Sequence, residues 1–347
     1  MKINPVSTYA TSNSLRQNIR QLQNEILRRQ QEVSTGRLAD YGATLGTRSS
    51  ELTGQKRMVE RLASIVDTNA LAAARLDVTQ EGIGRVREYA EQLITAMTAS
   101  TSQGLGRAAI LETAQQTLTG MEDVLNLSFN GASVFGGINS DAKVTDGFLD
   151  SAAKAAFDTS FQTYFGFAKD DPAAASIDAT AMRDFLDTVV TPQFFGTDWT
   201  TNYSNASDTG IVSRITLTQT QVTSFSANDD GFRGAIMAAV IASELFDSNI
   251  GQAALREVSN KALELSGQAT GDLADLQGRA GVAQEQLSRA TARLEAQSSI
   301  LQERVAGIEA IDQYEASTSL SGLLTQLDIS FSLTTRIQQL SIMNYLS

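Results

Sequence analysis

A seven-residue apolar repeat between Leu273 and Ile311 most constrains how this chain can fold. One series of residues recurs at every seventh position, and a second series follows three residues behind it. This spacing places both series on one face of a long helix, which must be buried against other helices. At 1.5 Å per residue, a helix over about 253–312 would be roughly 90 Å long. The first series is Leu273, Ala280, Leu287, Leu294, Leu301 and Ile308, and the second is Leu276, Ala283, Ala290, Gln297, Arg304 and Ile311, with Glu303 and Glu309 among the charged residues between them.

Apolar spacing predicts further helices toward the N-terminus. Residues 13–35 have apolar positions at helical intervals, and Gly36 is well placed to end that helix. A second long helix begins near Ser49, and a third covers about 107–127. Asn69 and Thr79 interrupt the apolar stripe of the second helix. They are either polar residues that set the register of the bundle or residues at the edge of the stripe.

The C-terminal segment has two apolar stripes on one predicted helix. The first contains Leu320 and Phe331, and the second, displaced by two positions, begins at Leu333. A helix with two apolar stripes is contacted from more than one side, as in a wall built from several chains. We therefore predict that the terminal helices pack between subunits. The candidate packing residues are Leu15, Ile19, Leu22, Ile26, Leu320, Leu324, Leu327, Phe331, Ile337 and Leu340.

The composition changes in the middle of the chain. Residues 130–228 hold 13 of the 22 aromatic residues and eleven Asp, but no Glu. Asp, Asn, Thr, Gly and Pro favour turns and short elements over long helices. The alternation around Ile211–Phe225 is typical of strands. We expect a mainly α protein: a long antiparallel helical bundle or coiled coil from both chain ends, with an inserted mixed α/β outer domain. The predicted parts are a terminal assembly domain (1–48 and 313–347), a long bundle domain (49–129 and 229–312) and the insert (130–228).

The residue types exclude several classes of function. The chain has no Cys and no His, so disulfides, thiol catalysis and the commonest general base are absent. A net charge of −12 argues against a nucleic acid partner. No apolar run is long enough for membrane insertion, and the N-terminal residues lack the apolar core of a cleavable signal peptide. Asn228-Asp229-Asp230-Gly231 lacks the ligand spacing of an EF-hand. We expect no catalytic, cofactor-binding or metal site.

Four stretches resemble the flagellin superfamily. They are Glu32-Val-Ser-Thr-Gly-Arg37; Val124-Leu-Asn-Leu-Ser-Phe-Asn-Gly-Ala-Ser-Val-Phe-Gly-Gly137; Leu273-Ala-Asp-Leu-Gln-Gly-Arg279; and the C-terminal stretch from Leu327 to Ser347. The resemblance covers about 1–140 and 230–347 and is closest to the hook-associated proteins that join hook to filament. The segment Leu38–Gly46 departs from the Pro-Ser-Asp-Asp-Pro-like pattern of the family.

The resemblance implies a structural role rather than an enzymatic one. The chain would form a ring of subunits between hook and filament through self-assembly. Its partners would be hook and other hook-associated proteins, flagellin and an export chaperone. It would reach the extracellular flagellum through the flagellar type III apparatus without a cleaved signal peptide. A filament flagellin is the nearest alternative. A cytoplasmic signalling coiled coil would explain the repeat but not the aromatic insert, and an enzyme within 130–228 would lack any motif.

Overall fold

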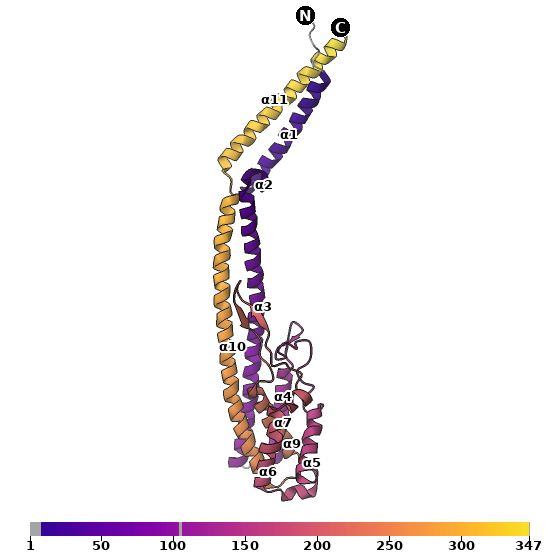
Figure 1. The fold of residues 1–347 in the computed structure, drawn as a ribbon, viewed down its shortest axis with the longest axis vertical. Helices are drawn as coiled ribbons and strands as arrows, with labels where there is room; N and C mark the ends of the chain where they lie inside the picture. The colour runs from indigo at the N-terminus through magenta and orange to yellow at the C-terminus, as the bar shows by residue number, and fades with distance from the viewer. Residues whose placement is uncertain (1–7, 104–105, 347) are drawn as a thin grey trace. The chain divides into compact units, whose positions relative to one another are not determined.

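The computed structural model describes residues 8–103 and 106–346, and it is 75% helical (Figure 1). The expected class is confirmed: long helices come from both chain ends, and a small inserted region carries two small antiparallel sheets. The elements in chain order are α1 (Thr8–Thr35), α2 (Tyr41–Leu45), α3 (Arg48–Gln103), α4 (Arg107–Leu125), β1 (Ser128–Phe129), β2 (Ala132–Ser133), α5 (Ala152–Phe165), η1 (Pro172–Ser176), α6 (Ala179–Phe185), η2 (Leu186–Val190), α7 (Thr191–Phe195), α8 (Asp198–Asn202), β3 (Val212–Arg214), β4 (Thr220–Val222), α9 (Asp230–Phe246), α10 (Gln252–Glu309) and α11 (Gln313–Leu346).

The chain forms two compact units. One contains residues 1–63 and 295–347, and the other contains residues 64–294. The boundaries between the units fall within α3 and α10. The three-part division into terminal, bundle and outer domains stays a prediction.

In the unit of residues 64–294, the seven-residue repeat of α10 is buried as predicted. Leu273, Leu287 and Leu294 are each at most 2% exposed. The apolar stripe of α3 is buried as well, with Leu76 and Leu93 fully inaccessible. The repeat is weaker in the other unit, where Gln297 and Arg304 are exposed and Leu301 and Ile308 are only partly buried. Polar side chains at the second series explain why burial lapses after residue 294.

Asn69 joins three elements of this unit. Its side chain is 1% exposed, and its Nδ2 donates to the Ile215 carbonyl at 3.0 Å and to the Thr291 hydroxyl at 3.1 Å. One amide thus ties α3 to the segment after β3 and to α10. A buried amide that must find fixed partners sets the register of packed helices, which supports the first of the two interpretations of Asn69. Thr79 instead donates within α3, to the Arg75 carbonyl.

Helix α9 is the centre of the core. Fifteen of its seventeen residues are buried, and α4 packs along it. The inserted region covers another side of α9, because the Phe135 ring meets the Phe232 ring edge to face at 5.0 Å. Gly82 on α3 makes room for this pair, since a Cβ there would lie 2.7 Å from the Phe135 ring. Residues of the inserted region therefore share one hydrophobic core with α3, α4, α9 and α10.

The inserted region contains short elements, as its composition predicts. Two residues with positive φ, Asn130 at 52° and Gly131 at 80°, make the turn between β1 and β2. Asn-Gly is the residue pair that such a tight turn favours. Strands β3 and β4 pair with Val212 opposite Val222. Three short elements, η1, α6 and the π-turn η2, divide the stretch 172–190.

Candidate functional site

Helices α1 and α11 pack side by side within the unit of residues 1–63 and 295–347 (Figure 1). Ile26 on α1 and Ala316 on α11 are the most buried apolar residues of these two helices among those described, at 7% and 3% exposure. The pairing buries or partly buries six of the ten residues proposed for subunit packing. These six are Leu15, Ile19, Leu22, Ile26, Leu320 and Leu327.

The first apolar stripe predicted on α11 does not face α1 as one unit. Leu320 and Leu327 are partly buried, whereas Leu324 is 43% exposed and Phe331 is 46% exposed. The face turned to α1 also includes Leu323, which the sequence analysis did not select. Ile337 and Leu340, the candidates from the second stripe, lie where side chains are outside the described residues.

Apolar side chains remain exposed on two flanks of α11. Leu324 and Phe331 lie on one flank, while Ile329 and Leu333 are 54% and 47% exposed. A helix turns by about 100° per residue, so Phe331 and Leu333 point about 160° apart. Helix α1 therefore packs against a face between the two apolar flanks and covers neither of them. Exposed apolar residues on two sides of one helix are typical of a surface that contacts other chains.

The ends of α1 and α11 are fixed by capping residues. Gly36 follows α1 with φ of 69°, a conformation that glycine adopts without strain, and its amide donates to the Glu32 carbonyl at 2.8 Å. Asp312 precedes α11, and its carboxylate accepts hydrogen bonds from the amides of Tyr314 and Glu315. Both helices thus start or stop at defined positions next to each other in the fold.

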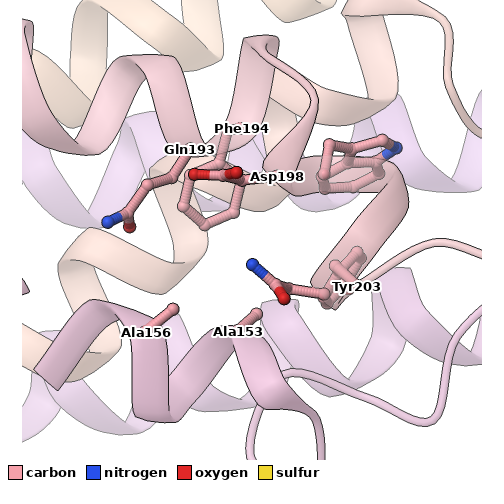
Figure 2. A pocket seen from close by; sticks show the side chains of 8 residues that line it. Ala153, Ala156, Gln193, Phe194, Asp198 and Tyr203 are labelled. Atoms are coloured by element: carbon pink, nitrogen blue, oxygen red, sulfur yellow. The ribbon is translucent and has the colours of Figure 1, made fainter. Parts of the chain in front are cut away.

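A cavity between α5, α7 and α8 is too small to bind a substrate. Figure 2 shows Ala153 and Ala156 of α5 facing Gln193 and Phe194 of α7 across it, and its volume is about 10 Å³. A space of that size holds roughly one water molecule. The Tyr203 hydroxyl nearby is already engaged, because it donates to the Glu122 carboxylate at 3.0 Å.

Burial disfavours the charged forms of the groups in this Tyr203–Glu122 pair. It raises the pKa of Tyr203 well above its usual value, and the nearby carboxylate raises it further. Burial also raises the pKa of Glu122, although the Phe148 amide, which donates to it at 2.7 Å, opposes that change. The pair fastens α4 to the segments that precede α5 and follow α8.

An acidic groove of about 430 Å³ lies between the start of α9 and α10. Asp229, Asp230, Asp272 and Asp275 line it, and Arg279 pairs with Asp229 at 3.5 Å. Burial raises the pKa of Asp229. Among the described residues, no group of acidic side chains has the arrangement that a metal ion requires. Asp229 lies at the N-cap position of α9, and Asn228 before it accepts a hydrogen bond from the Trp199 indole at 2.7 Å.

Two regions of the sequence match known protein families. Residues 6–140 match the bacterial flagellin N-terminal helical region, and residues 263–346 match the bacterial flagellin C-terminal helical region. Together these regions include more than half of the chain, and they contain α1, most of α10 and α11. The chain belongs to the flagellin superfamily. Its relatives are structural components of the flagellum, so the family points to a structural role and not to catalysis.

A solved structure supports the same fold. It is a protein from Vibrio parahaemolyticus that is provisionally described as flagellar hook-associated, and it matches with a TM-score of 0.54 at 9% identity. The match covers 77% of this flagellin-superfamily chain and 99% of the Vibrio chain. No curated protein sequence is significantly similar. Within the described ranges, no helix combines the length and apolar character needed to cross a membrane.

The apolar spacing predicts the helices of this surface but not its division into faces. The predicted packing residues include Leu324 and Phe331, which lie on an exposed flank, but not Ile329, which lies on the other flank. Ile329 lies four residues before Leu333, so extending the second stripe by one helical turn toward the N-terminus would have included it.

Proposed function

We propose that this chain is a subunit of the junction that joins the flagellar hook to the filament. The observation that carries the proposal is the pair of apolar flanks that α1 leaves uncovered on α11. In a monomer these side chains face water, and in a ring or helical assembly the helices of neighbouring subunits would cover them. Contacts that differ on the two sides of a subunit generate such rings and helices. The proposal includes the ten residues that the sequence predicts to pack between subunits.

The partners of the proposed subunit would be copies of itself, other hook-associated proteins, hook protein and flagellin. It would be exported through the flagellar type III apparatus with the help of a cytoplasmic chaperone, and it would act outside the cell. The similarity in fold to the Vibrio protein, whose description names the hook-associated class, favours the junction.

Electron microscopy of a deletion strain tests the junction role. We expect cells that make hooks but no filaments, with filaments restored by the wild-type gene. Normal filaments on the deletion strain would end the proposal. A complementing gene with Phe331→Ser should restore filaments poorly, whereas Ser332→Ala, an exposed polar position one residue away, should restore them fully.

A filament flagellin is the second candidate, because the matched regions are those of bacterial flagellin. Immunogold labelling with an antibody to this chain distinguishes the two roles. A junction subunit should be labelled only in a short zone next to the hook. Label along the whole filament would identify a filament subunit instead, and the apolar flanks of α11 would then serve filament packing.

A further inference from the structure

The connections between α1 and α2 and between α10 and α11 run past each other as a paired ribbon. The Leu38 amide donates to the Glu309 carbonyl at 2.9 Å, and the Ile311 amide donates to the Gly36 carbonyl at 3.2 Å. These two bonds flank the antiparallel bridge between Arg37 and Ala310. Because α1 also packs on α11, neither connection can bend without the other. The two helices form a hairpin that would move as one body.

Glu309 is the residue that ties this ribbon to the neighbouring helices. Its side chain is 2% exposed although it carries a carboxylate. Lys56 of α3 forms an ion pair with it, and Arg37 of the first connection lies 3.5 Å away. Lys56 also lies over the Tyr41 ring of α2, at 4.5 Å from its centre. A single carboxylate therefore links the end of α10 to α3, to the ribbon and, through Lys56, to α2.

The ion pair between Lys56 and Glu309 is a specific contact that holds these two residues together. The hydrogen bond to Glu309 raises the pKa of Lys56, against the opposing effect of burial. A buried carboxylate without a partner is strongly unfavourable. The contacts of Glu309 with Lys56 and Arg37 are therefore favoured for as long as Glu309 is buried. Lys56 and Arg37 are themselves 41% and 63% exposed, which leaves them free to turn to solvent when the carboxylate is removed.

The ion pair lies beside a groove that is open to solvent. The groove, of about 460 Å³, lies between α3 and α10, with Val59, Val305 and Ala306 in its walls. The ion pairs of Glu309 with Lys56 and Arg37 therefore cross the joint at the edge of this groove.

A second buried carboxylate provides a contrast. Glu32, also 2% exposed, accepts hydrogen bonds from Arg29 at 2.9 Å and from the Ala39 amide at 3.3 Å. Both partners belong to α1 or to the connection that follows it. Glu32 thus fixes the local path of the chain without linking the hairpin to α3 or α10.

We propose that Glu309 is the latch of a two-stranded hinge, and that its ion pair with Lys56 sets the angle between the α1–α11 hairpin and the adjoining ends of α3 and α10. With the latch closed, the hairpin has one angle. With the latch open, the ribbon bonds still join the two connections, and the hairpin swings as a unit. This inference does not depend on where in the flagellum the chain acts.

Spin labels can test the hinge directly, because the chain contains no cysteine. Glu303→Cys on α10 and Gln326→Cys on α11 place labels at exposed positions on either side of the ribbon. Distances between the labels are measured by double electron–electron resonance in the full-length monomer. We expect one narrow distance distribution for the otherwise unchanged chain. Glu309→Gln keeps the shape of the side chain and removes its charge, and should widen the distribution two- to threefold.

Two further variants keep the test specific. Lys56→Met should widen the distribution as Glu309→Gln does, because it removes the other half of the pair. Glu32→Gln should leave the width unchanged, since its bonds do not cross the joint. Circular dichroism should show equal helical content in all four proteins. The proposal is overturned if Glu309→Gln keeps the narrow distribution, if Glu32→Gln widens it equally, or if the starting protein is already as broad as Glu309→Gln.

Discussion

The exposed ring of Phe331 should contribute to assembly and not to the stability of the monomer. An aromatic side chain buries about 150–250 Å², and Phe331 is 46% exposed, so roughly 70–115 Å² of it is available to a neighbouring subunit. At about 25 cal/mol per Å², covering that area stabilises the contact by about 2–3 kcal/mol. Each 1.4 kcal/mol is a factor of ten, so Phe331→Ser should raise the critical concentration for assembly by about 30- to 100-fold.

The assay for this prediction is polymerisation of the purified protein, followed by light scattering and sedimentation. Thermal melts of the monomer, followed by circular dichroism, should give the same midpoint for Phe331→Ser and the starting protein. Leu327→Ser should behave differently, because Leu327 faces α1 and its loss should also weaken the hairpin. Ser332→Ala should change neither measurement. An unchanged critical concentration for Phe331→Ser would refute the role of this flank, and a lowered melting midpoint would place the ring in the monomer core.

Four other expectations follow from the unit of residues 64–294. Leu294→Asp places an unpaired charge where the side chain is 2% exposed and should cost several kcal/mol, seen as a large drop in the melting midpoint; an unchanged midpoint would mean that this face of α10 is open. Gly82→Ala should lower the free energy of unfolding by about 1–3 kcal/mol, because the added Cβ would meet the Phe135 ring. Gly278→Ala should raise it by up to about 1 kcal/mol, because its Cβ meets nothing within 4 Å. Urea titrations measure both values, and equal effects would contradict the packing around Gly82. Burial raises the pKa of Glu122, so the folded state keeps this proton to higher pH than the unfolded state does, and stability is lost as pH rises above about 4.5. Glu122→Gln has no proton to lose and should show a smaller decrease in unfolding free energy between pH 5 and pH 8; an equal decrease would exclude Glu122 as its source. Deletion of 135–225 removes the side chains that cover α9 and should yield an aggregating protein by size-exclusion chromatography; a soluble, cooperatively melting product would show that α9 is covered without them.

The long helices were predictable because the apolar periodicity of a helix can be recognised within its own sequence. The repeat from Leu273 to Leu294 indicates a buried face without reference to any other segment. Asn69 was recognisable as an anomaly on a stripe, but its partners Ile215 and Thr291 were not, since they come from distant parts of the chain.

Glu309 was beyond sequence analysis for the same reason. It lies among several charged residues between the two apolar series, and nothing in its neighbours distinguishes it from Glu303. In the structure Glu309 is buried and Glu303 is exposed. Lys56, more than 250 positions away in the sequence, forms its ion pair with Glu309 and not with Glu303. Burial of a charge is decided by a partner, and a partner is a property of the tertiary fold.

The division of α11 into faces was partly predictable. Two stripes indicated contact from more than one side, and the exposed flanks agree with that expectation. The position of α1 between the two stripes was not predictable. A helix as polar as α1 packs through a narrow apolar face, and the number of apolar residues on each side of α11 does not show which side that face contacts.

The pairing of α1 with α11 has a consequence for folding kinetics. It joins residues 8–35 to residues 313–346, so its contacts have nearly the largest sequence separation this chain allows. Closing so long a loop costs entropy before any contact offsets it, and topologies of this kind form slowly. During synthesis, α1 emerges first and waits for α11, whereas residues 64–294 can already fold. A chain interrupted before residue 313 therefore has a folded middle and an N-terminal helix without its partner.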